Sequence, residues 1–483
     1  MAKKKKDKVT IEFIGNNSTS VTGSATLISF GDRKILFECG GIQEGKTTFD
    51  NYKLNRNQMS KIKAKDIDMV IGGHFMHYDH GGNVPALLKQ NPNIRIITGK
   101  NTIGILKEMW LDSAFINIRD CEDLSRIYPD KTFTPLYDES DVKQALSMVE
   151  EYDVGEIYEL DENISIRYTY SGHILGATQC EIFIKLNNHI HKILMTSDLG
   201  NTSIQHLKPF VEKFEPVLKS ETVIAECTYG SRDNKKITNK IIEKDLEKIK
   251  SVIEQFCKDN KRRVLIPVFS LDKCPVMLWL IYQMFKNDKG FDTKVVVDSP
   301  LTNRLLDRYQ EVLEGELRDK FDEMLAWKNL IRIVEPSDSK YAIETMTNVL
   351  VLSSGGMLQS GRSVKWCQAL LPHSNDCLIL CGYCGENTLG YKIKNFSDQK
   401  TININGKPVK NKAQIVNIRS LSGHMQREDM LKYYSSIHAK KIYLVHGEMN
   451  GKVEFAHDLK EEIANKSMTT GVCVVNKGTT ITL

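Results

Sequence analysis

The sequence contains no long apolar run. No stretch of its 483 residues approaches the roughly 18 to 20 consecutive apolar residues that a membrane-spanning helix requires. The N-terminus, MAKKKKDKVT, is basic, but no apolar segment follows it, so it does not match a secretory signal. We therefore expect a cytoplasmic protein with no membrane partner.

The sequence also has few paired cysteines, only a small excess of positive over negative charge, and no internal repeats. Of the 11 cysteines, only Cys381 and Cys384 form a C-x-x-C pair, and no second pair lies nearby to complete a four-ligand structural zinc site. We expect buried, reduced thiols. The net charge of +5 permits a polyanionic partner without requiring one. With 41% hydrophobic and 26% charged residues, the chain is not disordered, and its length indicates two or three domains.

Strand patterns dominate both ends of the chain, whereas strands and helices alternate in its middle. We predict helices over 85–90 and 101–117, and strands over 9–40, 66–73, 164–170, 180–186, 192–196 and 222–226. From about residue 230, apolar strands such as 264–270 and 348–354 alternate with helical patterns, which is typical of a parallel sheet. The chain is therefore predicted to be α/β, with a first domain formed by 1–225 and 413–483 and an inserted domain formed by 226–412.

The strongest signal for chemistry is a histidine-rich segment that directly follows a predicted strand. It reads HFMHYDH over residues 74–80 and contains three histidines and one aspartate. Imidazole nitrogen and carboxylate oxygen are both good zinc ligands. Because the chain has only 12 histidines, three of them in one short segment are an improbable coincidence. The segment predicts metal binding.

Four later segments each place a histidine or an aspartate in a loop next to a strand-like run. They are SGHILGA, MTSDLGN, SLSGHMQ and YLVHGEM, which contain His173, Asp198, His424 and His446. One such residue by itself is more often structural than a ligand. Together with the histidine-rich segment, however, they could supply seven ligands among their eight such residues, enough for two metal ions that share a carboxylate.

These segments together resemble the metallo-β-lactamase superfamily, and specifically its β-CASP ribonucleases of the bacterial and archaeal RNA-processing type, relatives of the cleavage and polyadenylation endonuclease. H-x-D-H at 77–80 is similar to the family's metal motif, and Glu226 in AECTYGSR to the acidic residue of its first β-CASP motif. VLIPVFS, VVVDSPL and SSGGMLQSGR resemble segments of the family's inserted domain. The resemblance implies an αββα metallo-β-lactamase sandwich with an inserted α/β β-CASP domain that contains a parallel sheet.

The resemblance also implies two Zn²⁺ ions per chain and a set of catalytic residues. One ion would be held by His74, His77 and His173, the other by Asp79, His80 and His446, and Asp198 would bridge them. Asp79, Glu226 and His424 are the expected catalytic residues: His424 would protonate the leaving 3′ oxygen, and Glu226 would orient His424. In SSGGMLQSGR, the residues expected to bind neighbouring phosphates are Ser354, Gly355 and Arg362.

The expected substrate is single-stranded RNA, cleaved to 5′-phosphate and 3′-hydroxyl ends. RNA-acting members of the family carry histidine at the position of His446, and no RRM or KH module accompanies the motifs here. A catalytically weak or inactive RNA-binding protein and a hydrolase of small thioesters or lactams are alternatives. Endonuclease versus exonuclease mode and a homodimer are left open.

Two positions depart from the family pattern. The family's first histidine lies two residues before the second, whereas His74 lies three residues before His77. A strand bulge with Met76 as the extra residue would restore the spacing. Glu38 stands where the family has an aspartate that supports a ligand histidine.

Overall fold

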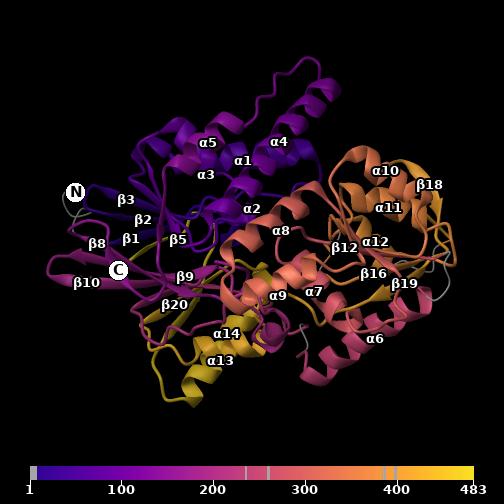
Figure 1. Cartoon of the computed structure of the whole chain (residues 1–483). Coiled ribbons are helices and arrows are strands. Elements are labelled where there is room, and N and C mark those ends of the chain that lie inside the picture. The colour runs from indigo at the N-terminus through magenta and orange to yellow at the C-terminus, as the bar shows by residue number, and fades with distance from the viewer. Residues whose placement is uncertain (1–7, 234–235, 258–261, 383, 386–387, 396–399) are drawn as a thin grey trace. The chain divides into compact units, whose positions relative to one another are not determined.

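The computed structural model describes residues 8–233, 236–257, 262–382, 384–385, 388–395 and 400–483. The chain forms two compact units (Figure 1). The first unit comprises Met1–Thr202, Val211–Lys236 and His424–Leu483, and the second comprises Ser203–Phe210 and Ile237–Gly423. Compared with the predicted boundaries, residues 226–236 belong to the first unit, and residues 203–210 and 413–423 belong to the second.

The first unit contains two sheets between layers of helices, so the predicted αββα sandwich is confirmed (Figure 1). The first sheet has the order β22 (Thr480–Thr482), β1 (Thr10–Phe13), β2 (Thr26–Phe30), β3 (Arg33–Phe37), β4 (Met69–Ile71), β5 (Arg95–Gly99) and β6 (Val149–Tyr152). The second has the order β21 (Gly471–Val474), β20 (Lys441–Val445), β11 (Thr222–Glu226), β10 (His189–Met195), β9 (Thr178–Leu186), β8 (Ile164–Tyr170) and β7 (Ile157–Glu159). The helices of this unit are α1 (Thr48–Ile62), α2 (Tyr78–Gly81), α3 (Val84–Gln90), α4 (Ile103–Ile127), α5 (Glu139–Ser147), α13 (Arg427–Tyr434) and α14 (Met449–Asn465).

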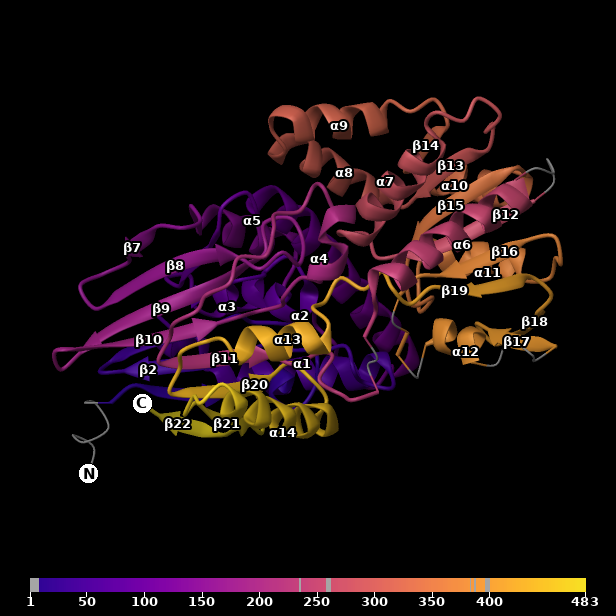
Figure 2. The same ribbon diagram turned by 90° about the horizontal axis from the view of Figure 1, so that it is seen from below.

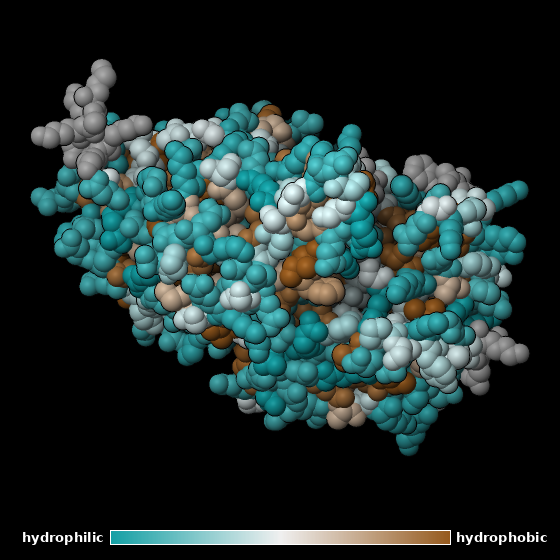
Figure 3. Space-filling view, turned by 90° about the horizontal axis from the view of Figure 1, so that it is seen from above, coloured by the Kyte–Doolittle hydropathy of each residue, from teal (hydrophilic) through white to brown (hydrophobic). Residues whose placement is uncertain are grey.

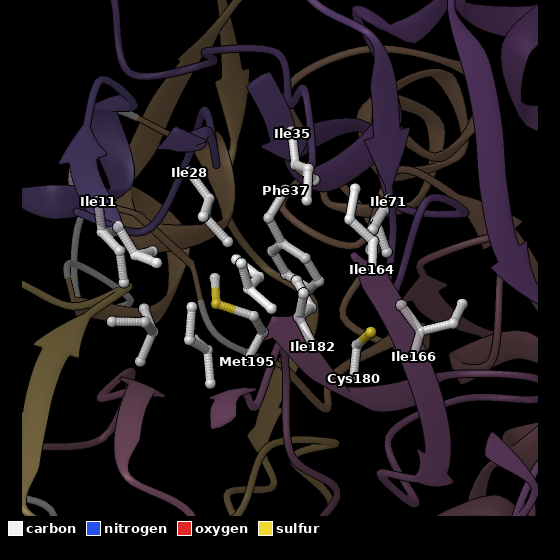
Figure 4. Packing of buried hydrophobic residues seen from close by; sticks show 14 of the residues in the cluster. Ile11, Ile28, Ile35, Phe37, Ile71, Ile164, Ile166, Cys180, Ile182 and Met195 are labelled. Atoms are coloured by element: carbon white, nitrogen blue, oxygen red, sulfur yellow. The ribbon is translucent and has the colours of Figure 1, made fainter. Parts of the chain in front are cut away.

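Apolar side chains from the inner faces of the two sheets form the core of the first unit (Figure 4). Along β8, buried and partly exposed residues alternate, because successive side chains of a strand point to opposite faces of the sheet. Ile164 and Ile166 of β8 are fully buried with Ile28 and Ile35 of the facing sheet. Each such side chain stabilises the fold by about 1.5–3 kcal/mol relative to an exposed one.

Strand direction in the second sheet sets the place of the candidate site. β10 pairs in parallel with β11, and β11 in parallel with β20. β8 runs in the same direction as β10, because β9 between them is antiparallel to both. The carboxyl ends of β8, β10, β11 and β20 therefore all lie at one edge of the sheet, where loops with functional residues commonly converge.

The second unit has a six-stranded sheet in which every pairing is parallel, as the alternating pattern predicted. Its order is β14 (Leu330–Ile333), β13 (Lys294–Asp298), β15 (Val349–Ser354), β12 (Arg263–Val268), β16 (Cys377–Leu380) and β19 (Gln414–Asn417). The central strands show no alternation of burial, because helices cover both faces of such a sheet. Its helices are α6 (Asn239–Cys257), α7 (Lys273–Phe285), α8 (Pro300–Val312), α9 (Gly315–Leu325), α10 (Pro336–Thr345), α11 (Arg362–Leu370) and α12 (Leu389–Asn395).

A separate two-stranded sheet, which the sequence pattern did not predict, consists of β17 (Thr401–Ile404) and β18 (Lys407–Lys410). Both thiols of the C-x-x-C pair, Cys381 and Cys384, are buried and free, as expected.

Hydrophilic residues predominate on the molecular face in Figure 3. Among the described residues, no helix combines the length and apolar character needed to cross a membrane.

One lysine is fully buried in the first unit. Lys452 of α14 has no exposed surface, and its ammonium donates hydrogen bonds to the carbonyls of Ser18 and Val475, the latter at 3.3 Å. Burial lowers the pKa of Lys452 to about 8, although the neighbouring Cys227 acts in the opposite direction. The lysine ties the loop around Ser18 to α14 and to the C-terminal strands.

We predict that this buried lysine makes stability depend on pH above 8. An unfolded chain keeps lysine protonated up to about pH 10.4, whereas the folded chain releases this proton from about pH 8. The unfolded state therefore binds more protons in that window, and the unfolding free energy rises with pH. Denaturant unfolding at pH 7.5 and 9.5 should show wild type gaining stability relative to Lys452→Met, by at most about 1.4 kcal/mol per pH unit. A constant difference between the two proteins would contradict the prediction.

Candidate metal centre

The predicted ligands come together at the edge of the sandwich where the four strands end. His173 follows β8, Asp198 follows β10 and His446 follows β20. The segment with His74, His77, Asp79 and His80 follows β4 of the other sheet. The loops of the site approach each other so closely that two positions accept only glycine. A Cβ atom at Gly40 would lie 1.6 Å from the carbonyl oxygen of Asp79, and a Cβ atom at Gly200 would lie 1.9 Å from the carbonyl oxygen of Gly172.

Two groups of side chains are each compact enough to hold one ion. In the first, the ligand atoms of His74, His77, His173 and Asp198 all lie within 4.8 Å of one another. The second group consists of Asp79, His80 and His446. Asp198 lies between the groups, because its Oδ2 is 3.6 Å from His173 Nε2 and 3.3 Å from His80 Nε2.

The irregular spacing of the first two histidines is accommodated by a turn. Residues 72–77 form a loop beyond β4, with a turn at the buried Phe75 and Met76. The turn brings the ring centroids of His74 and His77 to 4.4 Å, and that of His74 to 5.2 Å from His173. The expected strand bulge at Met76 is therefore wrong: the extra residue lies in a loop that is not paired in the sheet, where a turn can reverse the direction of the side chain.

The chemistry of these atoms fits a metal ion. Both ring nitrogens of His74, Nε2 of His80 and of His446, and Oδ1 of Asp198 are buried and have no hydrogen-bond partner. Leaving one such group unsatisfied costs about 1–3 kcal/mol, and more for a charged group. A cation with nitrogen and oxygen ligands satisfies these atoms together.

Charge and burial set the protonation of the centre. Burial and the neighbouring His77, His80 and His173 hold the pKa of His74 well below its usual value, so this imidazole is neutral, the form in which histidine binds metal. Burial by itself would raise the pKa of Asp198, but the surrounding imidazoles outweigh burial and hold it well below the usual range. Asp198 is therefore ionised, the form in which a carboxylate can bind a metal ion.

Glu38 supports the second group from outside. Its Oε2 lies 2.8 Å from His80 Nδ1, so the longer carboxylate does reach the ligand histidine. The hydroxyls of Ser24 and Ser197 each donate to this carboxylate at 2.6 Å. A carboxylate behind a ligand histidine fixes the ring orientation and makes the other nitrogen a stronger ligand. The sequence pointed to Glu38 but contained no signal for the two serines, which are distant from it along the chain.

Backbone strain also gathers at this centre. Glu38, Ser197 and His446 adopt left-handed φ values of 61°, 49° and 49° although none is glycine. Such conformations cost roughly 1–3 kcal/mol each and persist only where the surroundings enforce them. For His446 the surroundings are clear: its N–H donates to the Asn17 carbonyl at 2.7 Å, and its Nδ1 lies 3.0 Å from Thr228 Oγ1. Sequence analysis did not identify Asn17 or Thr228.

A third group, formed by Asp198, Glu226 and His424, shares Asp198 with the first group. His424 Nδ1 is 3.9 Å from Asp198 Oδ2 and 3.9 Å from Glu226 Oε1, and the His424 side chain is 24% exposed. The two carboxylate oxygens of Glu226 accept from the backbone N–H of Leu199 and of Thr228, at 3.0 and 2.9 Å. Burial lowers the pKa of His424, but Asp198 and Glu226 outweigh burial, so the pKa is raised overall. His424 is thus a solvent-accessible imidazole held next to a fixed carboxylate.

The three residues predicted to bind phosphate lie in the second unit. Ser354 ends β15, Gly355 follows it with a φ of 108°, and Arg362 begins α11. The Arg362 guanidinium contacts Asp298 at 2.6 Å, and its side chain is only 12% exposed. The structure thus shows Arg362 in an internal ion pair, and its contact with phosphate stays a prediction.

Two family models match the chain. Residues 276–393 match the Beta-Casp domain, and residues 408–469 match the Zn-dependent metallo-hydrolase RNA specificity domain. Both matches lie in the half of the chain where the resemblance predicted the inserted domain and the later histidines.

Curated proteins similar to the chain cover most of its length. The transcription termination factor FttA of Methanocaldococcus jannaschii is 23% identical over 94% of this chain and 69% of its own. Ribonuclease TTHA0252 of Thermus thermophilus is 25% identical over 89% of this chain and 91% of its own. Integrator complex subunit 11 of Danio rerio is 24% identical over 91% of this chain and 69% of its own.

A solved structure of a protein of unknown function from Enterococcus faecalis matches the fold. Its TM-score is 0.53 and its identity 14%, with 99% of this chain and 100% of that chain covered. At this identity the match concerns the fold alone.

We predict that Glu38→Gln weakens metal binding about 10- to 100-fold, because an amide orients His80 and increases its basicity less than a carboxylate does. Metal retention against increasing chelator concentrations is the measurement. Glu44→Gln is the matched control, because Glu44 accepts hydrogen bonds from Ser20 and Thr22 in the same part of the chain. If Glu38→Gln and Glu44→Gln retained metal equally well, Glu38 would have no supporting role.

Proposed function

Because the chain belongs to the β-CASP family of the metallo-β-lactamase superfamily, a family of metal-dependent hydrolases that act as nucleases, we propose that it is a zinc-dependent ribonuclease. The proposed substrate is single-stranded RNA, and the proposed products carry 5′-phosphate and 3′-hydroxyl ends. The observation that carries the proposal is the convergence of seven ligand side chains beside Glu226 and His424. A cytoplasmic location is part of the proposal.

Two zinc ions would be held by this chain. His74, His77 and His173 suit one ion, Asp79, His80 and His446 suit the other, and Asp198 is within reach of both groups. Bound zinc lowers the pKa of water and withdraws charge from phosphate oxygens. Asp79 and His80 lie in the short helix α2, and the other five residues lie in the loops that follow strands.

His424 is the proposed proton donor to the leaving 3′ oxygen. It is the histidine of the centre that is assigned to neither of the two ligand groups, and part of its side chain is exposed to an incoming substrate. Glu226 would act as a positioning residue. Its two backbone hydrogen bonds fix the carboxylate, which in turn limits the orientations of the His424 ring. Proton donation of this kind contributes roughly 10²–10⁴ in rate.

RNA as the substrate is supported by His446, by one relative and by one family model. The histidine at this position resembles that of RNA-acting family members, and here it belongs to the second ligand group. One relative is named a ribonuclease, and the model that matches residues 408–469 carries RNA specificity in its description.

A catalytically weak RNA-binding protein is the second candidate function. The observation that favours it is the displaced His74, whose position depends on the turn at Phe75 and Met76. Metal content distinguishes the two candidates.

We predict close to two zinc ions per purified chain, and about one after His74→Ala, because that substitution removes a buried ligand of the first group. Mass spectrometry of metals gives the count, with the exposed His438→Ala as control. One ion or fewer in the wild-type protein would favour the second candidate.

We predict that His424→Ala and His446→Ala separate catalysis from metal binding. His424→Ala should keep the zinc content of wild type and reduce cleavage of single-stranded RNA by roughly 10²–10⁴. His446→Ala should lower both zinc content and cleavage, since it removes a ligand of the second group. Zinc content and RNA cleavage are measured on the same samples. Full cleavage by His424→Ala at normal zinc content would exclude His424 as the acid.

A further inference from the structure

One short segment of the second unit is strongly basic, as is the N-terminal MAKKKKDK. Residues 392–412 contain six lysines and one acidic residue, Asp398, a net charge of +5. The whole chain has 66 basic and 61 acidic residues and the same net charge of +5. The residues outside this segment therefore have a combined net charge of zero.

The structure presents most of these lysines on a hairpin, which we call the lysine hairpin and define as residues 400–412. β17 and β18 pair across Asn405 and Gly406, whose left-handed φ values of 51° and 80° suit a two-residue turn between antiparallel strands. Ile402, Ile404 and Val409 anchor one face in the core of the second unit. Figure 2 shows the hairpin beside α12, which adds Lys392 and Lys394.

The lysines of the hairpin are available to an external partner. Lys400, Lys407, Lys410 and Lys412 are all exposed. Among the described residues, none of the four is in an ion pair with a carboxylate. The lysines of α6 differ, because Glu243, Asp245, Glu247 and Glu254 are interleaved with them.

We propose that the lysine hairpin binds the phosphate backbone of single-stranded RNA without reading its sequence. The proposal rests on RNA being the substrate and adds a second contact surface for it. A lysine ammonium is a compact charge that attracts phosphate and has no group suited to distinguishing bases here. Several such charges close together on one hairpin match the regular charge of a nucleic-acid strand better than the isolated carboxylates of a protein surface.

The same residues admit a simpler explanation. Both strands of the hairpin have unpaired edges, and lysine and Pro408 at such edges prevent pairing with other chains. Edge protection requires charge but no RNA contact, so the two explanations differ in how RNA affinity responds to salt.

The test compares two variants that lose the same charge. One carries Lys→Gln at 400, 407, 410 and 412, and the control carries Lys→Gln at 240, 244, 248 and 250 on α6, where all four lysines are also exposed. Both are made in the full chain with His424→Ala, so that bound RNA stays intact. Affinity for a labelled single-stranded RNA is measured by fluorescence anisotropy at several salt concentrations.

Each lost phosphate contact should make the slope of log affinity against log salt less steep by about 0.7, hence by up to about 2.8 for the hairpin variant. The α6 variant should keep the wild-type slope. Equal changes of slope in both variants would mean that RNA affinity depends only on the net charge of the protein. An unchanged slope in the hairpin variant would mean that the lysines protect the strand edges and do not contact RNA. Either result overturns the proposal. The proposal is also overturned if polyglutamate binds as tightly as RNA and this binding requires the lysine hairpin. That result would indicate an acidic protein partner.

Two controls keep the result interpretable. If the fourfold variant does not fold, Lys407→Gln with Lys410→Gln should still reduce the slope by about 1.4. RNA cleavage by the wild-type protein is measured separately. Hairpin-dependent binding without any cleavage refutes the proposed ribonuclease and leaves the hairpin proposal standing, whereas cleavage with an unchanged slope refutes the hairpin proposal alone.

Discussion

The buried carboxylate of Asp198 is the group on which the rest of the centre depends. It is 1% exposed and lies within 4 Å of nitrogens of His80, His173, His424 and His446. An ionised carboxylate in a protein interior is strongly unfavourable unless opposite charge compensates it. Imidazoles contributed by several loops surround it, and their remaining lone pairs suit cations. A cation would satisfy these side chains together, which accounts for the buried polar atoms of the centre that have no hydrogen-bond partner in the described part of the chain.

Holding that assembly requires support from distant parts of the chain. Glu38 fixes His80, the Asn17 carbonyl and Thr228 fix His446, and two backbone amides fix Glu226. The left-handed conformations of Glu38, Ser197 and His446 are tolerated because these contacts and the two packed sheets enforce them. The chain leaves the first unit for the whole of residues 237–423 and then returns, so that β20 completes the sheet and brings His446 to the edge where Asp198 already lies. The returning segment therefore adds both a strand to the second sheet and His446 to the second ligand group.

The second unit contributes a different kind of chemistry. Its sheet has both faces covered, and its polar signature residue Arg362 is held by Asp298 inside the unit. Its surface charge, by contrast, is concentrated in the segment that contains the lysine hairpin. The first unit thus carries buried charges of opposite sign at close range, whereas the lysine hairpin of the second unit carries exposed charges of one sign.

The sequence by itself determined the fold class, and it predicted the residues that the structure brings together in the two candidate ligand groups. Apolar strands alternate with polar residues where one face is exposed and are continuous where both are covered, so β8 and β12 were predictable from local pattern. The cluster HFMHYDH and the lone residues in Gly-rich loops indicated metal binding because few other roles need so many histidines at strand ends. The β17–β18 hairpin was missed, since its strands are short and carry lysines on the open side.

Only the tertiary structure decided how His74 reaches the centre, because a turn in an unpaired loop has no periodic signature. It also decided which residues lie behind the ligands: Ser24, Ser197 and Thr228 are adjacent to Glu38 or His446 in space and far from them in sequence, and a local pattern contains no information about such distant contacts.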